Sequence, residues 1–160
     1  MINSYLKTGV FFLLFFVSIV GYSQFRAGAG ITMPVSQGDA FAGFQLKGTY
    51  AITEAIEVSG AFSHIFNSFI NWNAIDIDGA YVFPVSEQVG IFPEAGLLVN
   101  MVSYTGWGGS RISDTNAGIN LGVGSNISIT EKFILVPDIR YSFVEGGGYM
   151  RINLIFQYVF

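Results

Sequence analysis

The sequence predicts an all-β protein: an eight-stranded antiparallel up-and-down barrel (a meander) that crosses a membrane and follows a cleavable signal peptide. Three observations predict this fold. Apolar and polar residues alternate along segments of about the length that a membrane-crossing strand needs. Hydrophobic residues make up 51% of the 160 residues, yet beyond the N-terminus no run approaches the roughly 18 apolar residues of a membrane-spanning helix. The charged residues within the alternating segments all fall on one face.

The N-terminal residues 1–23 predict a secretory signal peptide. They contain a basic residue at Lys7, an apolar run from Val10 to Val20, and a small residue at Ser23. The run is short for a spanning helix, so we expect cleavage after Ser23 and one barrel domain over residues 24–160. An exported, apolar chain without a spanning helix can satisfy its backbone in lipid only as a closed barrel.

Eight alternating segments follow, each bounded by turn residues. The last is the most regular: in MRINLIFQYVF an apolar residue occupies every second position from Met150 to Phe160. An even number of strands returns both termini to the same side of the membrane. We expect strands at 24–34, 41–53, 56–66, 72–83, 89–102, 116–129, 133–143 and 149–160.

The connections between these segments are of two kinds. Three are short and repeat an aliphatic residue, a hydroxyl residue and Glu: Ile52-Thr53-Glu54, Val85-Ser86-Glu87 and Ile129-Thr130-Glu131. The others, Ser36–Ala40, Asn67–Asn71, Ser103–Thr115 and Val144–Gly148, vary in length. Short turns on one rim and longer loops on the other are typical of outer-membrane barrels, which predicts that the short turns are periplasmic.

Aromatic residues near the predicted strand ends indicate girdles at the two membrane interfaces. They are Tyr50, Trp72, Tyr81, Phe83, Tyr104, Trp107, Phe133, Tyr141, Phe143, Tyr158 and Phe160.

Two prolines interrupt the strand pattern. Pro93 and Pro137 each lie inside a predicted strand and are each followed by an acid, Glu94 and Asp138. Proline cannot donate a ladder hydrogen bond, and a closed barrel has no free edge to accept it. We therefore expect a bulge or local unpairing at both sites.

The apolar face carries no Lys, Arg, Asp or Glu, as a lipid-facing surface requires, because a charge near the bilayer midplane costs about 2–4 kcal/mol. The opposite face carries nine charges, and an eight-strand interior is just wide enough for side chains to fill it. We expect a closed lumen of paired charges; an ion or proton path, or a paired-carboxylate catalyst, is the functional alternative. The predicted network comprises Arg26, Lys47, Glu57, Asp76, Asp78, Glu94, Asp138, Arg140 and Arg151.

Alternation alone does not state which face points inward. A soluble lipocalin-like carrier would bury the apolar face around a ligand and expose the polar face. The polar face is instead rich in small residues and poor in the charges that a soluble surface needs, which favours the membrane barrel. The small residues include Gly118, Asn120, Gly122, Gly124, Asn126 and Ser128.

The signal peptide, the eight alternating segments, the charge-paired lumen and the terminal Tyr158-Val159-Phe160 together resemble the small outer-membrane β-barrel superfamily of Gram-negative bacteria, which includes the OmpA transmembrane domain and OmpX. The resemblance covers residues 24–160 and rests on pattern, with no active-site motif. It implies an outer-membrane location, contact with membrane lipid and lipopolysaccharide, a monomer, and recognition of Tyr158 and Phe160 by the barrel-assembly machinery. Most loops are shorter than those of relatives that act as adhesins or receptors.

Composition and motifs exclude several kinds of chemistry. The sequence has no cysteine, so disulfides and zinc–thiolate sites are ruled out, and a net charge of −4 offers no basic footprint for nucleic acid. Asp76-Ile77-Asp78-Gly79 lacks most of a calcium loop. The single histidine, His64, lies near the outer end of the third strand with no assignable Ser and acid partners. We expect no cofactor, no metal and no catalytic site.

The longest predicted connection, SYTGWGGSRISDT (Ser103–Thr115), carries Tyr104, Trp107 and Arg111 as candidate contacts for a ligand or partner. The expected function is a structural or surface-interaction role in the cell envelope. The alternatives are a narrow, porin-like channel for small or apolar solutes, an outer-membrane lipid-modifying enzyme using His64, and the soluble carrier.

Overall fold

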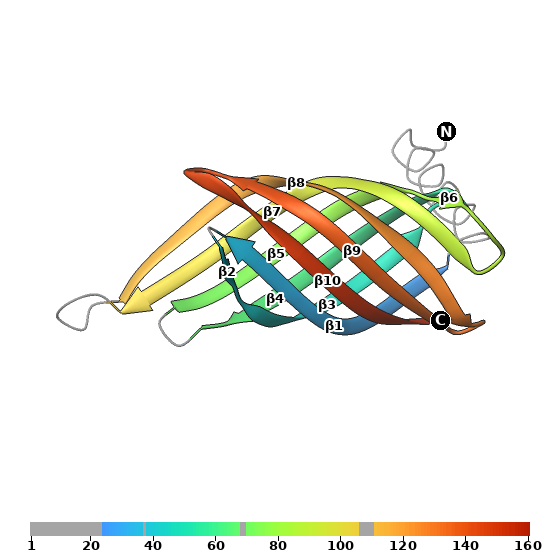
Figure 1. Cartoon of the computed structure of the whole chain (residues 1–160), viewed down its shortest axis with the longest axis horizontal. Coiled ribbons are helices and arrows are strands. Elements are labelled where there is room, and N and C mark those ends of the chain that lie inside the picture. Colours follow the sequence, from blue (N-terminus) through green and yellow to red (C-terminus); the bar gives the residue numbers. More distant parts are fainter. Residues whose placement is uncertain (1–23, 37, 68–69, 106–110) are drawn as a thin grey trace, which may run out of the picture.

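A computed structural model describes residues 24–36, 38–67, 70–105 and 111–160; the predicted signal peptide lies outside this range. The described chain is a meander of strands that are tilted around a barrel (Figure 1). Its strands are β1 (Phe25–Ser36), β2 (Asp39–Ala40), β3 (Ala42–Ala51), β4 (Ile56–Phe66), β5 (Ile70–Tyr81), β6 (Phe83–Pro84), β7 (Val89–Thr105), β8 (Arg111–Thr130), β9 (Phe133–Val144) and β10 (Gly147–Val159). Within the described residues, no helix is long and apolar enough to cross a membrane.

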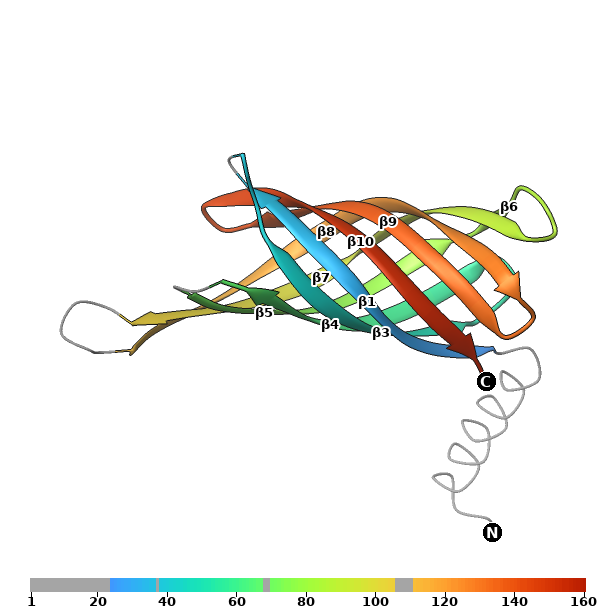
Figure 2. The same cartoon turned by 60° about the horizontal axis from the view of Figure 1, so that its bottom comes forward.

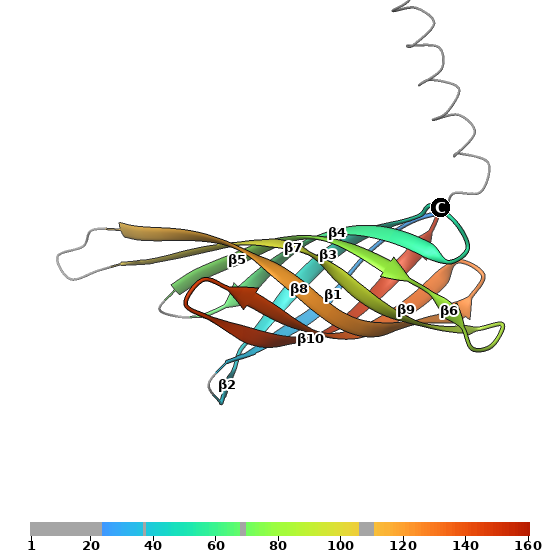
Figure 3. The same ribbon diagram turned by 90° about the horizontal axis from the view of Figure 1, so that it is seen from above.

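Eight long strands close the barrel. Each pairs antiparallel with its sequence neighbours, and β1 pairs with β10 from Arg26 opposite Val159 to Val35 opposite Met150. The two-residue strands β2 and β6 pair with β1 and β7 respectively. Figures 2 and 3 show the closed wall from two further sides. The eight-stranded antiparallel barrel predicted from the sequence is therefore confirmed.

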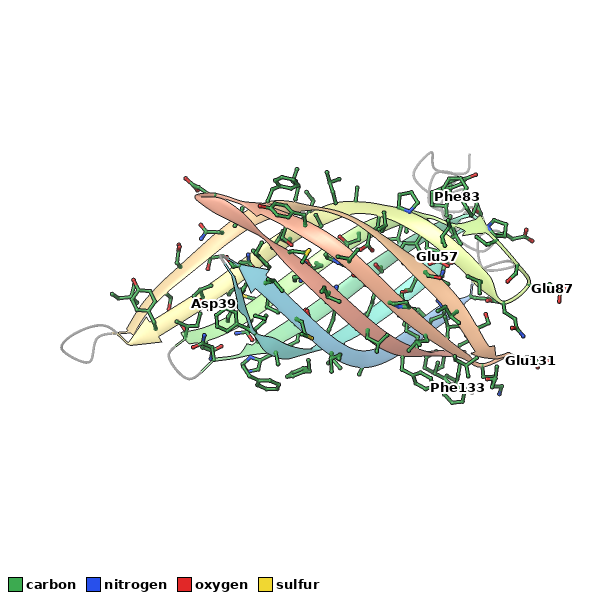
Figure 4. All side chains as sticks on the ribbon, viewed as in Figure 1. Asp39, Glu57, Phe83, Glu87, Glu131 and Phe133 are labelled. Carbon is green, nitrogen blue, oxygen red and sulfur yellow. The ribbon has the colours of Figure 1, made fainter. Side chains whose placement is uncertain are left out.

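The two ends of the barrel differ. The connections 52–55, 85–88 and 131–132 lie at the end that also holds Gln24 and Phe160, which we call the turn end; the opposite end is the loop end. Figure 4 shows Glu87 and Glu131 at the turn end and Asp39 at the loop end. In each turn the hydroxyl accepts backbone hydrogen bonds, for example from Ile56 N to Thr53 Oγ1 at 3.0 Å, which explains the repeated Ser or Thr.

Exposure alternates along the long strands wherever they form the barrel wall. Leu97 and Ile77 on the outer face are 65% and 61% exposed, whereas Asp76 and Asn120 on the inner face are fully buried. The apolar face is therefore outside, and the soluble carrier with an apolar interior is wrong. Aromatic rings gather on the outside of the turn end, where Phe133 stacks on Phe156 at 5.1 Å between centroids (Figure 4 labels Phe133). Trp72, predicted among the girdle aromatics, instead points inward and is 8% exposed.

The predicted loop Ser103–Thr115 is mostly strand. β7 continues to Thr105 and β8 begins at Arg111, because cross-strand pairs such as Tyr104–Ile112 and Val102–Asp114 extend the ladder. β9 ends at Val144, opposite Gly118, so residues 111–117 of β8 pair with β7 alone. The result is a ribbon of β7 and β8, flanked by β5 as far as Ile70 opposite Tyr104, that projects beyond the rest of the loop end (Figure 1). The sequence did not predict this part of β8 as a strand because polar residues lie on both of its faces, so apolar and polar residues do not alternate there.

The two prolines do cause local unpairing, but not bulges. The β8–β9 pairs stop at Gly124–Asp138 and resume at Ile127–Leu135, leaving Pro137 unpaired on that side. The β5–β7 pairs stop at Ala80–Glu94, and β6 resumes pairing at Phe83–Ile91. On the other side of each strand the pairing continues: Pro137 lies opposite Leu154, and Pro93 lies opposite Val123. The backbone N–H of a strand residue bonds to only one of the two neighbouring strands. Replacing that residue by proline therefore interrupts only one of the two ladders of its strand. The register shift in the β8–β9 ladder lies elsewhere, between Ser128 and Thr130.

The lumen as candidate functional site

The structure places all nine predicted charges on the lumen side, where eight are buried and Glu57 is half-buried. Each has an oppositely charged partner within 4.0 Å. The pairs are Arg26–Glu57, Lys47–Glu94, Lys47–Asp138, Arg140–Asp78, Arg140–Glu94, Arg140–Asp138 and Arg151–Asp76.

The pair nearest the turn end joins the second residues of β1 and β4. Arg26 Nη2 donates to Glu57 Oε2 at 2.6 Å, and the Asn126 amide donates to the same carboxylate at 3.2 Å. This pair is the least enclosed, since the Glu57 side chain keeps 12% of its exposure. Figure 4 shows Glu57 toward the turn end of the barrel.

The middle of the lumen holds three carboxylates around two cations. The Arg140 guanidinium lies 2.6 Å from Asp78 Oδ2, 2.9 Å from Glu94 Oε1 and 3.0 Å from Asp138 Oδ1. Lys47 Nζ lies farther from its partners, 3.7 Å from Asp138 and 3.8 Å from Glu94. Buried charges are tolerated only when paired, and these five side chains, three acids and two bases, form one ion-paired cluster.

Toward the loop end, Arg151 and Asp76 form a two-pronged ion pair at 2.9 and 2.5 Å. Asn120 connects this pair to the central cluster, because its amide donates to Asp76 Oδ1 at 2.8 Å and to Asp78 Oδ1 at 3.2 Å. Its carbonyl accepts from Ser142 Oγ at 2.8 Å. From the sequence Asn120 was interpreted only as a small lumen residue; nothing in its strand context marks it as the bridge.

Glycines on β8 make room for this network. Gly122 lies opposite Glu94 on one side and Arg140 on the other. A Cβ at Gly122 would lie 2.8 Å from Arg140 Cβ and 2.9 Å from Glu94 Oε1, too close for either to stay in place. The long side chains therefore meet across a strand that offers no side chain at that point. The predicted preference for small lumen residues has this cause.

Apolar clusters lie at both ends of the charged column. At the turn end, Phe92 packs with Val82, Ile134, Val136 and Ile155. At the loop end, Trp72 packs edge-on against Tyr149 at 5.1 Å, beside Ile65. The Trp72 indole and the Tyr149 hydroxyl both donate to Asn100 Oδ1, at 3.3 and 2.9 Å. The alternation in the sequence assigned these residues to a face of the barrel wall but did not show that they form two apolar clusters inside the lumen.

The arrangement offers little chemistry. Among the described residues, no group of three or more His, Cys, Asp and Glu side chains is placed to hold a metal ion. His64 lies on the outer wall between the rings of Phe44 and Phe66, and its Nδ1 is 2.9 Å from Asn73 Oδ1. The other contacts that the structure gives this histidine are with aromatic rings rather than with a nucleophilic hydroxyl or thiol.

The remaining predicted site residues lie at opposite ends. Tyr104 is 43% exposed and belongs to β7, Arg111 opens β8, and Trp107 lies outside the described residues. At the turn end Phe160 is 74% exposed, with its ring 5.1 Å from that of Tyr158. The Phe160 N–H donates to Phe25 O at 3.0 Å, beside the β1–β10 pairing.

Known structures share this architecture. The N-terminal β-barrel domain of Pseudomonas aeruginosa OprF superposes with a TM-score of 0.70 at 17% identity, covering 86% of this chain and 97% of that one. The fold is that of the small outer-membrane β-barrels. Ail, the attachment invasion locus protein of Yersinia pestis, matches at 0.64 and 18% identity over 86% and 97% of the two chains. Neisserial surface protein A matches at 0.65 and 18% over 86% and 95%. No family model and no curated protein sequence matches the chain.

Proposed function

We propose that this protein is a closed outer-membrane barrel with a structural or surface-contact role in the cell envelope, rather than an open pore. The observation that carries the proposal is the lumen: paired charges fill its middle, and apolar clusters around Phe92 and Trp72 occupy its two ends. An aqueous path would need both clusters and the ion pairs to separate together.

The proposal includes export by the predicted signal peptide, with the turn end in the periplasm and the loop end outside. Short turns and both barrel termini on one rim support that orientation. Outer-membrane lipid and lipopolysaccharide would contact the exposed apolar band. The barrel-assembly machinery would recognise Tyr158 and Phe160, and the folded protein would be a monomer. We propose no enzymatic activity, since His64 faces the lipid band between two phenylalanine rings.

Surface contact would use the ribbon formed by β7 and β8. Tyr104 and Ile112 lie opposite each other near its end and are 43% and 44% exposed. Ail has also been solved with the heparin analogue sucrose octasulfate, a polyanion. The loop end of this chain instead carries Asp39, Asp114 and Glu145 against Arg111. We therefore propose a neutral or cationic surface partner.

Conductance in planar bilayers tests the closed lumen. The purified, correctly folded protein should show no steady single-channel current, because ions cannot cross the two apolar clusters. A steady current would instead support the narrow-channel alternative, which the polar column between the clusters favours.

Whole cells test the envelope role. Loss of the protein should change detergent sensitivity if the role is structural, or surface adherence if it is contact. The double variant Tyr104→Ser with Ile112→Ser should reduce adherence and leave detergent sensitivity unchanged, while Ser113→Thr on the same ribbon serves as the matched control. If removal of the whole protein alters neither property, the proposal is wrong.

A further inference from the structure

The Lys47 ammonium is buried beside two carboxylates but is hydrogen-bonded to neither. Its side chain is 4% exposed, and its nearest carboxylate oxygens lie at 3.7 and 3.8 Å, beyond hydrogen-bond reach. An ammonium carries three N–H donors, and donors left unpaired in a buried site cost free energy. Polar contacts longer than about 3.5 Å are commonly bridged by water.

A small cavity adjoins this ammonium. It lies between the Arg26–Glu57 pair and the Lys47–Glu94 pair and leaves about 10 Å³ for the centre of a water molecule. That is about the smallest space that holds one water. Phe92 and Val136 of the turn-end cluster also line it.

The polar atoms around the cavity match a single neutral molecule. Arg26 Nε and Asn126 Oδ1 are buried, and within the described residues neither has a hydrogen-bond partner. The charged lining residues are two cations, Arg26 and Lys47, and two anions, Glu57 and Glu94. A metal ion would be repelled by the cations and a halide by the carboxylates, so the balanced lining favours an uncharged occupant.

We propose that this cavity is a binding site for one buried water molecule, which links Lys47 to the turn-end pair. Water accepts two hydrogen bonds and donates two. The Lys47 ammonium and Arg26 Nε supply donors, and Asn126 Oδ1 with a carboxylate of the lining supplies acceptors. The water would join the Arg26–Glu57 pair and the central cluster into one polar network, as Asn120 does between the central cluster and the Arg151–Asp76 pair.

Nuclear magnetic resonance tests the site directly. In the ¹⁵N-labelled protein in lipid nanodiscs, the Asn126 side-chain amide should show a cross-relaxation peak to water, with the sign of a long-lived water. Amide protons exchange slowly, so this peak reports proximity rather than exchange. A wild-type spectrum without the peak overturns the proposal, whether or not any variant folds.

Two serines of β4 give a matched pair of variants. Ser59 lines the cavity, whereas Ser63, two inward-facing positions nearer the loop end, accepts a hydrogen bond from Gln45 and lies outside the lining. Ser59→Val should fill the cavity and abolish the water peak at Asn126, and Ser63→Val should leave it. Gel mobility with and without boiling confirms that each barrel is folded. Retention of the full peak in folded Ser59→Val would also contradict the site.

Discussion

Removal of Arg151 tests whether the lumen charges stabilise the barrel as pairs. Arg151 and Asp76 are both fully buried, and Asp76 has no second cation within 4.0 Å in the described lumen. Arg151→Met keeps an unbranched stem but removes the guanidinium, and leaves the Asp76 carboxylate with Asn120 as its hydrogen-bond donor. Breaking a buried pair by removing one partner typically costs 3–5 kcal/mol, so we expect the free energy of unfolding to fall by about that amount.

The assay is urea unfolding in lipid vesicles, followed by gel mobility without boiling. The double variant Arg151→Met with Asp76→Asn should recover at least half of the loss, because no unpaired charge remains in the lumen. Glu87→Gln in an exposed turn is the control and should stay within about 0.5 kcal/mol of wild type. A loss below about 1 kcal/mol for Arg151→Met, or a double variant no better than the single, would refute the reasoning.

Further predictions concern the wall. Leu121→Arg places a charge on an outer position that is 51% exposed; it should destabilise the barrel by about 2–4 kcal/mol and remove the heat-modifiable band, whereas Leu121→Phe should keep it. Gly96→Ala puts a Cβ 2.2 Å from Asp78 Oδ1, so urea unfolding should show a loss of about 1–3 kcal/mol. Gly79→Ala, whose Cβ meets nothing nearer than 3.9 Å, is the matched control; equal effects would contradict the packing argument.

The alternation determined most of the fold. In a strand, successive side chains point to opposite faces, so the separation of charged from apolar residues identified both the strands and the lipid-facing side. It failed where the two faces are equally polar. Residues 111–117, with Ser113 and Thr115 on one face and Asp114 and Asn116 on the other, carry no alternating signal, and their strand depends on pairing with β7.

The site was predictable as a set of residues but not as a network. The alternation of side chains along each strand assigned the nine charges to the interior, because the face of a side chain follows from its position in the strand. Which acid meets which base depends on stagger between strands distant in sequence: Asp76 and Arg151 are 75 residues apart. The sequence did not predict the apolar clusters for a related reason. In the loop-end cluster, Ile65, Trp72 and Tyr149 come from three strands and meet only when the barrel closes.

Ser125 places a hydroxyl on the outer, lipid-facing wall of the barrel. It occupies an outer position of β8, within an otherwise apolar groove of about 600 Å³ that Pro93 and Pro137 also line. Its hydroxyl donates to Gly90 O at 2.9 Å, beside the stretch where β8 and β9 are unpaired. Gly90 belongs to β7, where the β7–β8 ladder is continuous. A hydroxyl that faces lipid must find its partner within the protein, so this bond to a β7 carbonyl satisfies the Ser125 side chain and adds a link between β7 and β8. Ser125→Ala should therefore lower the free energy of unfolding by about 1 kcal/mol in urea, the usual net value of one hydrogen bond. Ser113→Ala on the exposed ribbon should change it by less than about 0.5 kcal/mol. An unchanged Ser125→Ala barrel would show that the carbonyl needs no side-chain donor.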